Sequence, residues 1–422
     1  MNALVCFLPL IGVAAVLPLP AGRIHAVRIV TLAALAAAVL ATPFAASGPQ
    51  VGKDFLLQEP EALTIALATA LTCAFLLVVT ARGLAGKGEM TWTLLLLGAL
   101  QLGCFTSARV IVVAVTPLIF LATSMVLQLR AQEGRDRAVR ILSSVGAIAT
   151  LLGIASLAFP EGSTLRSTLW FLYCVVVLGG FPFHFWLPRV LSGSPFLGAA
   201  LGCVVFGRFA ALVLLHFPPA GIGTLPVVFG LAGMLWCSFA AVAAEDLRER
   251  IGYFAGIQAG FALYAFGCGV PRLGVLYLLA TLPPILMWAL AACIVFDRIK
   301  FLTLRRLHGL ATQLPRLNLA LIVGGFGLSV LPGTVGFPGL CLLLERIKGT
   351  PALWVALTAV AATFLVCGST YVRIAFGEVA EELRRAGDLN ARELVSMILL
   401  GLLTLSGLVP VAAALLRKLA AQ

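Results

Sequence analysis

Apolar runs of about 20 residues recur from one end of this 422-residue chain to the other. A helix of about that length crosses the hydrocarbon core of a bilayer. Charged residues make up only 11% of the chain, against about 25% in a soluble globular domain, and the mean hydropathy is +1.09. Because no long polar segment separates the runs, we predict one all-α integral membrane domain over residues 1–422.

The bounds of the runs predict about fourteen transmembrane helices. We expect them at 2–19, 27–47, 60–82, 91–107, 109–130, 139–159, 166–188, 196–216, 224–244, 251–270, 273–296, 316–345, 351–372 and 394–416. The stretch 91–130 is too long for one helix, so we expect a turn at 106–109. No Lys or Arg precedes Arg23, which favours a first span over a signal peptide. We expect no long lateral helix after the last span.

The basic residues predict the orientation in the membrane. If both termini lie outside the cytoplasm, most of the 29 Lys and Arg residues fall in inner loops, Arg248 and Arg250 among them. The outer side then carries only Lys53, Arg109, Arg166, Arg272, Arg346, Lys348, Arg417 and Lys418. We therefore expect a multi-pass protein of a bacterial inner membrane with both termini on the non-cytoplasmic side. Loop residues then account for the net charge of +12, and we expect no nucleic-acid partner.

The composition gives no sign of catalysis or of a cofactor. All ten Cys residues fall in apolar runs, none forms a C-x-x-C pair, and the chain has only four His. Buried Cys most often acts as a small hydrophobic residue, so we expect neither a metal site nor a cofactor. The sequence also has no phosphate-binding loop and no nucleophile triad. We assign no catalytic residues to this chain.

Two predicted spans are interrupted by Pro and Gly in the same way. The broken-helix positions are Pro182 and Pro188 in the seventh span, and Pro332, Gly336, Pro338 and Gly339 in the twelfth. Proline removes a backbone donor and clashes with the preceding turn, so both helices should kink or unwind inside the membrane. The freed carbonyls must then face protein or a wet cavity.

The broken spans lie five spans apart, which predicts two five-helix repeats over 91–216 and 224–372. An odd number of helices per repeat turns the second repeat upside down relative to the first. Matched interruptions in inverted repeats are typical of transporters whose ion path runs between the repeats. The alternative is that the prolines only bend two packed helices.

Three motifs at these places resemble a known family. They are Phe181-Pro-Phe-His-Phe-Trp-Leu-Pro188; Asp246-Leu247-Arg248 followed by Tyr253, Gln258 and Gly260; and Leu331-Pro332 through Gly336-Phe337 and Gly339. Over about residues 60–375 the chain is similar to the antiporter-like, proton-conducting subunits of respiratory complex I, membrane-bound hydrogenases and Mrp-type cation/proton antiporters. The resemblance implies fourteen helices and two inverted five-helix repeats, each with a broken helix.

The resemblance also implies ionisable residues in the middle of the membrane, and this chain lacks most of them. Where the family has a Glu, two Lys, a His and an Asp, the sequence places Leu118, Val177, Leu340, Thr281 and Arg189. Arg208 stands where the family has another Lys. Because arginine keeps its charge at any accessible pH, it cannot relay a proton as a lysine can.

The candidates for an ion path are Arg208, His184, Gln258, Tyr253, Thr281 and Gln101. Arg208 is either a fixed charge beside a polar axis or a structural residue bonded to freed carbonyls. His184 could titrate near neutral pH or could fix the kink by bonding a carbonyl. The other four could line a hydrated path or join helices by ordinary hydrogen bonds.

We therefore predict an antiporter-like membrane subunit of a proton-translocating complex of the NADH:quinone oxidoreductase type, with a reduced or lost proton path. The expected partners are the lipid bilayer and other membrane subunits, including homologous ones. One alternative is a stand-alone cation/proton antiporter or small-ion carrier. Another is a non-conducting structural or anchoring subunit of a membrane complex.

Overall fold

The structure is a computed structural model that describes residues 2–45, 57, 61–82, 86–128, 135–193, 197–300, 302–379, 381 and 383–408. In these residues the regular structure is helical, and an isolated β-bridge joins Asp246 to Thr303. Within the part of the chain that the structure describes, eight helical segments are long and apolar enough by themselves to cross a membrane, and shorter apolar helices accompany them. The predicted all-α membrane class is confirmed.

Every predicted span contains at least one helix. The helices are α1 (Asn2–Val16), α2 (Ile24–Ala41), α3 (Ala62–Arg82), α4 (Lys87–Phe105), α5 (Arg109–Gln128), α6 (Arg135–Ala158), α7 (Thr164–Leu178), α8 (Trp186–Ser192), α9 (Leu197–His216), α10 (Leu225–Ala243), α11 (Leu247–Gly267), α12 (Pro271–Ala280), α13 (Leu282–Ile299), α14 (Leu310–Gln313), α15 (Pro315–Leu328), α16 (Phe337–Arg346), α17 (Ala352–Ala375) and α18 (Ala391–Thr404), with short 3-10 turns η1 (Thr42–Phe44), η2 (Phe183–Phe185), η3 (Leu383–Arg385) and η4 (Leu405–Leu408). The expected turn separates α4 from α5. The end of the last predicted span, 409–416, lies outside the described residues.

Both expected helix breaks are present. The seventh span divides into α7 and α8, and the twelfth divides into α15 and α16. The span expected over 273–296 is also interrupted, at Thr281, where α12 ends and α13 begins. This third interruption was not predicted. Its cause is local, because Pro283 and Pro284 follow directly and cannot donate the backbone hydrogen bonds that would continue α12.

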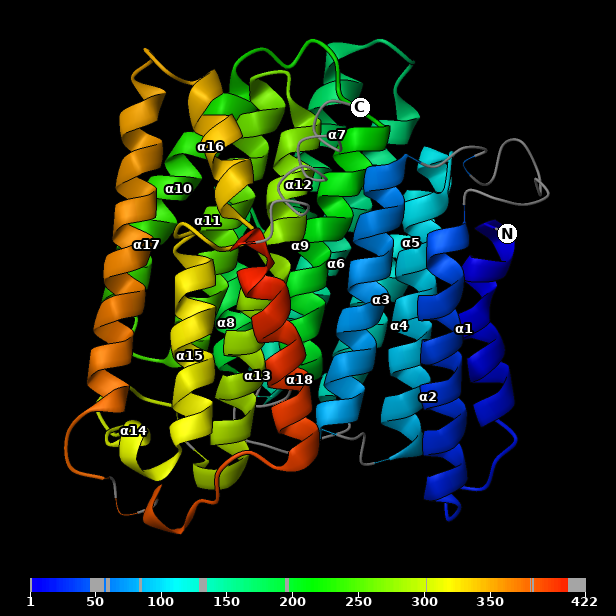
Figure 1. Ribbon diagram of the computed structural model, residues 1–422. Coiled ribbons are helices and arrows are strands. Elements are labelled where there is room, and N and C mark those ends of the chain that lie inside the picture. Colours follow the sequence, from blue (N-terminus) through cyan, green and yellow to red (C-terminus); the bar gives the residue numbers. More distant parts are fainter. Residues whose placement is uncertain are drawn as a thin grey trace. The chain divides into compact units, whose positions relative to one another are not determined.

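The chain divides into two compact units, Met1–Leu178 with Val205–Ile222, and Gly179–Val204 with Gly223–Gln422. In the first unit α4, α5, α6 and α7 contact one another in chain order, and α1 contacts α2 and α4. In the second unit α11 contacts α8, α10, α12, α13 and α17. Figure 1 shows α13, α15 and α18 of this unit running alongside one another.

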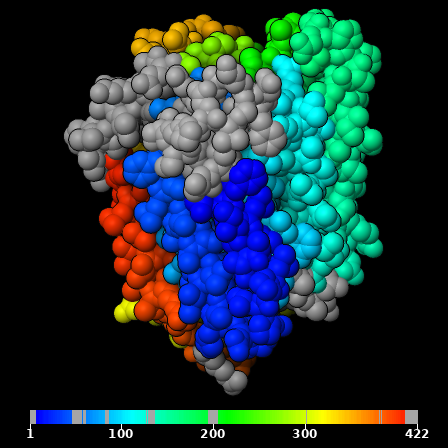
Figure 2. All heavy atoms as spheres, turned by 90° about the vertical axis from the view of Figure 1, so that its right-hand side faces the viewer, coloured from blue at the N-terminus to red at the C-terminus, as the bar shows by residue number. Residues whose placement is uncertain are grey.

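Several helices expose apolar faces, as expected for helices in contact with lipid. α2, α6 and α17 bury a third or less of their most apolar window inside the protein. Their exposed side chains include Leu40, Leu151, Trp354 and Leu365. In Figure 2, α1 and α2 of the first unit are drawn in dark and mid blue and present such a face. Apolar side chains need no other covering in a bilayer, since lipid tails are themselves apolar.

Glycines set the close packing of α10 on α11. A Cβ atom added to Gly260 of α11 would lie 2.9 Å from the Gly230 carbonyl oxygen and 2.9 Å from the Met234 amide nitrogen, both in α10. These are backbone atoms, which cannot move aside as a flexible side chain can. Small residues at helix interfaces in membranes allow this approach and the dispersion contacts that follow from it.

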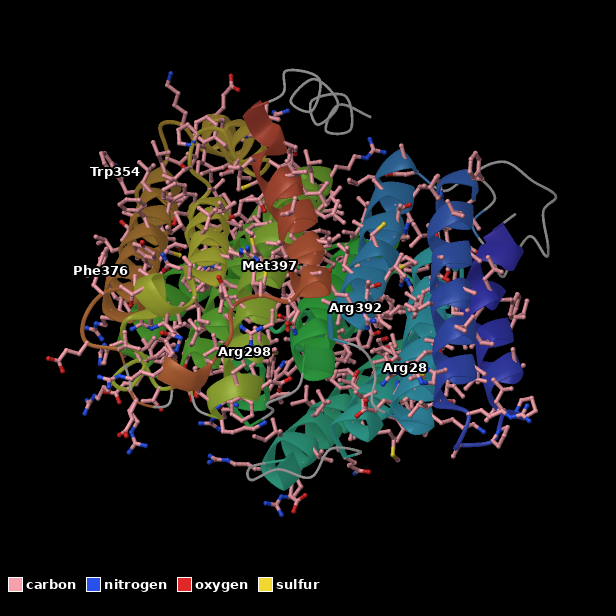
Figure 3. The ribbon with its side chains drawn as sticks, turned by 60° about the horizontal axis from the view of Figure 1, so that its bottom comes forward. Arg28, Arg298, Trp354, Phe376, Arg392 and Met397 are labelled. Carbon is pink, nitrogen blue, oxygen red and sulfur yellow. The ribbon has the colours of Figure 1, made fainter. Side chains whose placement is uncertain are left out.

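One end of the second unit is a network of polar loops. The Leu247 amide donates to the Leu302 carbonyl at 3.2 Å, and the Gly309 amide donates to the Phe376 carbonyl at 3.4 Å. Arg298 of α13 forms an ion pair of 2.6 Å with Glu393 of α18. Figure 3 labels Arg298 of this network, and Trp354 and Phe376 near the two ends of α17.

Candidate functional site

The first break separates α7 from α8 over residues 179–182. Gly179 has φ +69°, a conformation that favours glycine, and the Phe181–Pro182 peptide bond is cis. The chain then forms the 3-10 turn η2 and enters α8 at Trp186. Pro188 lies in the first turn of α8, where its missing N–H has no helical partner in any case.

His184 lies inside this break. Only 8% of the residue is exposed, and its ring stacks on Phe181 with a centroid separation of 5.6 Å. The ring of Trp236 in α10 packs edge-on against the His184 ring, with a centroid separation of 6.2 Å. The Nδ1 atom is buried and has no hydrogen-bond partner in the described part of the chain. A buried ring nitrogen in this state remains open to a water molecule or a proton.

The second half of the first broken helix is fixed against α11. A Cβ atom added to Gly252 of α11 would lie 2.6 Å from the Pro188 Cα atom and 2.7 Å from its nitrogen. Residue 252 must therefore stay small for α8 to approach this closely. Two of the three motifs that resemble the family, the one that ends at Pro188 and the one that contains Tyr253, therefore lie together in the second unit.

The second break separates α15 from α16 over residues 329–336. Val330 within it has φ +51°, which is rare for a β-branched residue. The Leu331 amide donates to the Phe326 carbonyl at 3.2 Å, which closes the end of α15. Pro338 occupies the second position of α16, where proline is tolerated. Strained backbone in a membrane persists only where surrounding structure holds it.

The interruption between α12 and α13 lies at this second break. The Thr281 hydroxyl donates to the Tyr277 carbonyl at 2.9 Å. A Cβ atom added to Gly336 would lie 3.6 Å from the Thr281 Cγ2 atom. The second unit therefore brings two interrupted helices together at Thr281 and Gly336.

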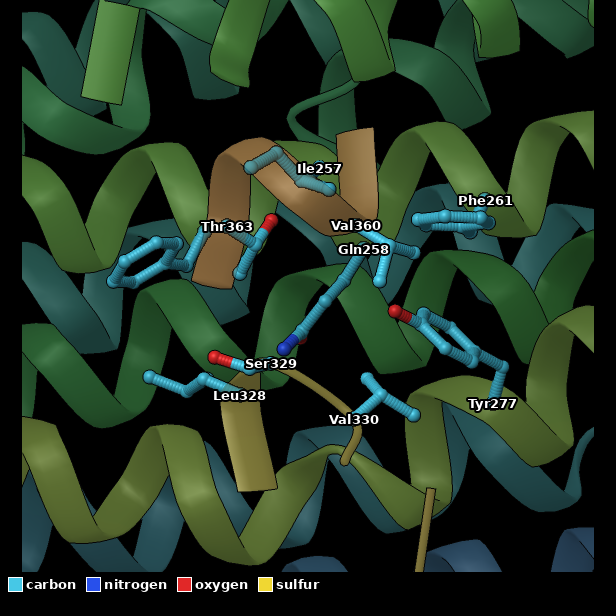
Figure 4. Close-up of a pocket in the computed structure, with 10 residues that line it drawn as sticks. Ile257, Gln258, Phe261, Tyr277, Leu328, Ser329, Val330, Val360 and Thr363 are labelled. Carbon is cyan, nitrogen blue, oxygen red and sulfur yellow. The ribbon is translucent and has the colours of Figure 1, made fainter. Parts of the chain in front are cut away.

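A small cavity lies at the start of the second break. Ten residues line it, from α11, α12, α15, α17 and the break itself, and none of them is charged. The polar ones are Gln258, Tyr277, Ser329 and Thr363. The cavity has a volume of about 10 Å³, which is room for about one water molecule. Figure 4 shows Gln258 reaching toward Ser329, with Tyr277 and Thr363 on either side.

The second unit holds four of the six predicted path residues. Gln258 lines the cavity and is 3% exposed, and Thr281 lies beside the same break. Tyr253 is on α11 but is not among the lining residues, and His184 lies in the first break. Tyr277, Ser329 and Thr363 also line the cavity and were not predicted. Tyr277 precedes Thr281 by one helical turn, which was the available signal, whereas nothing in the sequence marked Thr363.

The first unit holds the other two candidates. Arg208 of α9 is 1% exposed and is among the largest fully buried side chains. The Gln101 amide nitrogen donates to the Thr72 hydroxyl at 3.2 Å, which joins α4 to α3. In the described residues no three His, Cys, Asp or Glu side chains are close enough to hold a metal ion.

The positions where this chain has apolar residues in place of the family's ionisable ones differ in how deeply they are buried. Val177 and Leu340 are 1% and 4% exposed, whereas Leu118 is 55% exposed on α5. The buried polar group near Leu118 is Thr116, whose hydroxyl lies 2.5 Å from the Tyr173 hydroxyl. A neutral hydroxyl pair thus occupies the interior of the first unit at this level. This hydroxyl pair was not predicted.

Comparison with known proteins gives consistent matches. A family described as "NADH:quinone oxidoreductase/Mrp antiporter, TM" matches residues 142–366, more than half of the chain. The chain is 29% identical over 194 residues to NADH-quinone oxidoreductase subunit N 2 of Solidesulfovibrio magneticus, covering 43% of this chain and 40% of that protein. It is 31% identical over 240 residues to NADH-quinone oxidoreductase subunit 14 of Thermus thermophilus, covering 54% of each. The chain thus spans about half or less of the length of these relatives.

Solved structures share the fold over the whole chain. A chain of respiratory complex I from Thermus thermophilus with bound NADH has a TM-score of 0.84 at 20% identity, covering 100% of this chain and 99% of that chain. A chain of the Mrp complex from Dietzia sp. DQ12-45-1b has a TM-score of 0.85 at 17% identity, covering 100% and 97%. At these identities the likeness concerns the fold alone.

Proposed function

The chain belongs to the NADH:quinone oxidoreductase/Mrp antiporter membrane family, and from this premise we propose that it is an antiporter-like subunit of a larger proton-translocating complex. The complex is of the NADH:quinone oxidoreductase type. Relatives named as subunits of that enzyme, and the complex I chain with the same fold, support this assignment. Its partners are other membrane subunits, homologous ones included.

The neutral cavity at the second break carries the more specific proposal, a reduced proton path. Ionisable side chains in the membrane persist where they are used or paired. Here Gln258, Tyr277, Ser329 and Thr363 face space for about one water molecule, with no charged lining residue. Such a site can transfer a proton along hydrogen bonds through a water molecule, but its neutral side chains do not hold an excess proton. We infer that His184, in the first break of the same unit, supplies the titratable group that the path retains. Arg208, in the first unit, is a fixed charge that cannot relay a proton.

The two ranges 91–216 and 224–372 are, in this proposal, inverted five-helix repeats. The fourth span in each range is the broken one, α7–α8 in the first and α15–α16 in the second. Because each range has five spans, the chain enters the second repeat from the opposite side. The two breaks would then lie on opposite sides of one path, as in transporters with matched interrupted helices.

The polar network at one end of the second unit supports an orientation. The basic residues at that end are Arg248, Arg250, Arg298, Lys300, Arg305, Arg306, Arg316, Arg373, Arg384, Arg385 and Arg392. The helix ends on the other side carry Arg272, Arg346 and Lys348. Positive charge is retained on the cytoplasmic side. We propose that the network faces the cytoplasm of a bacterium, in the inner membrane, with both termini on the opposite side.

Mass spectrometry of the material that co-purifies with the chain from native membranes in mild detergent tests the assignment to a complex. We expect redox and membrane subunits in fixed ratio to the chain. A folded chain recovered alone would overturn this assignment and would favour a stand-alone carrier. The experiment needs no assumption about which residues conduct protons.

Proton flux tests the proposed path. In proteoliposomes that contain the assembled complex, we expect His184→Phe to lower proton translocation by about a hundredfold, the lower end of what a positioned acid or base contributes. Arg208→Gln should also lower it, because a buried fixed charge is lost. His184→Phe keeps an aromatic ring against Phe181 but removes the titratable nitrogens, so packing is retained. Arg306→Gln, at an exposed loop position, is the matched control and should have no effect. Normal flux in both variants, with normal assembly, would overturn the assignment of these two residues to proton translocation.

A further inference from the structure

The first unit contains a groove between α5 and α6 with a volume of about 530 Å³. This volume lies in the range of sites for small ligands. Pro117, Leu121 and Ser124 line it from α5, and Ser143, Ala147 and Leu151 line it from α6. Figure 2 shows these helices in cyan to blue-green at the right of the visible face.

Most of the groove suits a hydrocarbon chain. Both walls belong to apolar helices that are long enough to span a membrane. Leu121 and Leu151 stand on its rim with 45% and 66% of their surfaces exposed. From Ser143 to Leu151 the groove follows α6 for about 12 Å at the helical rise per residue. An acyl chain lying along the two helices would cover these walls without needing any hydrogen bond.

One polar atom in the groove points to a ligand with an acceptor. Ser124 is 3% exposed, and its hydroxyl oxygen is buried without a hydrogen-bond partner in the described part of the chain. Its neighbours on α5 behave differently, since the Thr116 and Thr123 hydroxyls donate to carbonyls four residues earlier at 2.8 Å each. A buried donor without an acceptor is costly, so an occupant that brings a carbonyl would be favoured.

Positive charge stands at the same end of the groove as Ser124. Arg137 and Arg140 lie in the first turns of α6, both exposed, with the acidic residue Asp136 beside Arg137. Arg140, Ser143 and Ala147 follow at helical spacings of three and four, so they share one face of α6. Ser143 lies about 4.5 Å further along the helix axis than Arg140.

We propose that this groove binds an anionic phospholipid. Arg137 and Arg140 hold the phosphate, the Ser124 and Ser143 hydroxyls donate to an ester carbonyl, and one acyl chain lies along the groove. The order of cation, hydroxyl and apolar surface along the two helices matches the order of phosphate, ester and acyl chain in the lipid. Basic residues at the mouth of a crevice between membrane helices are a recognised setting for anionic headgroups. A transmembrane helix from another subunit would leave the two arginines unused.

Native mass spectrometry of the full chain, released from mixed phosphatidylglycerol and phosphatidylcholine bilayers, tests whether the two arginines select an anionic headgroup. We expect one phosphatidylglycerol to be retained in preference to phosphatidylcholine. An arginine near the membrane surface strengthens binding to an anionic lipid by about fivefold, so the double variant Arg137→Gln/Arg140→Gln should lose about 25-fold in that preference. The double variant Arg306→Gln/Arg384→Gln removes the same charge elsewhere and should change nothing. An unchanged preference in the first variant would overturn the proposal.

Filling the groove tests the acyl-chain contact. Ala147→Trp, or Leu151→Trp if the first variant does not fold, should abolish retention of both lipids at this site while thermal unfolding stays near that of the wild-type chain. Retention of the lipid in a folded, blocked variant would contradict the proposal. So would a Ser124→Cys chain that cross-links in native membranes to a transmembrane helix of another subunit, since that helix would then occupy the groove.

Discussion

Replacing Arg250 by Met should lower the free energy of unfolding by about 3 kcal/mol, one of the two largest effects expected from a single change. Arg250 of α11 is only 2% exposed. Its Nε atom donates to the Ala244 carbonyl at 2.9 Å, Nη1 donates to the Thr370 hydroxyl of α17, and Nη2 donates to the Val242 carbonyl at 3.5 Å. These carbonyls end α10, where no helical donor is available. Met fills much of the volume but leaves them unsatisfied.

Reversible unfolding in detergent, followed by circular dichroism, measures this loss. Arg306→Met, at an exposed position of the same polar end, is the control and should stay within about 0.5 kcal/mol of the wild type. Thr370→Val should cost less than Arg250→Met, and the two changes together should cost less than their sum because they remove one shared hydrogen bond. Equal stability of the Arg250→Met and Arg306→Met chains would show that the arginine does not hold α10, α11 and α17 together.

Replacing Gly260 by Val should prevent α10 and α11 from packing at their native distance. The new Cβ atom would lie 2.9 Å from backbone atoms of Gly230 and Met234, and a valine adds two further methyl groups there. Overpacking of this kind costs about 1–3 kcal/mol when side chains can adjust, and here the obstructing atoms are backbone. Because α11 also carries Gln258 and contacts α8, α12 and α17, we expect loss of folded protein.

The yield of monodisperse protein in detergent and its thermal unfolding measure the effect of Gly260→Val. Gly368 of α17 offers a matched control, because an added Cβ atom there meets nothing within 4 Å. Gly368→Val should therefore fold in normal yield, although it introduces the same residue into the same kind of helix. A normal yield of the Gly260→Val chain would mean that the two helices can separate without loss of the fold.

The sequence by itself determined the class of the fold and the places where helices break. Both depend on local properties. The length of an apolar run decides whether a segment can cross a bilayer, and a proline removes a backbone donor wherever it stands. For this reason Pro182 and Pro338 were enough to locate the α7–α8 and α15–α16 breaks. The interruption at Thr281 had the same kind of signal in Pro283 and Pro284, although it was not predicted.

Only the tertiary structure decided which polar groups meet. Gln258, Ser329 and Thr363 line one cavity although they come from three different helical regions, and no spacing in the chain relates them. Arg250 was expected in an inner loop, yet it is buried because α10 ends beside it and α17 passes close enough for Thr370 to accept its hydrogen bond. Burial and pairing depend on packing between segments far apart in the chain. A one-dimensional pattern records the length and the breaks of helices but not their neighbours.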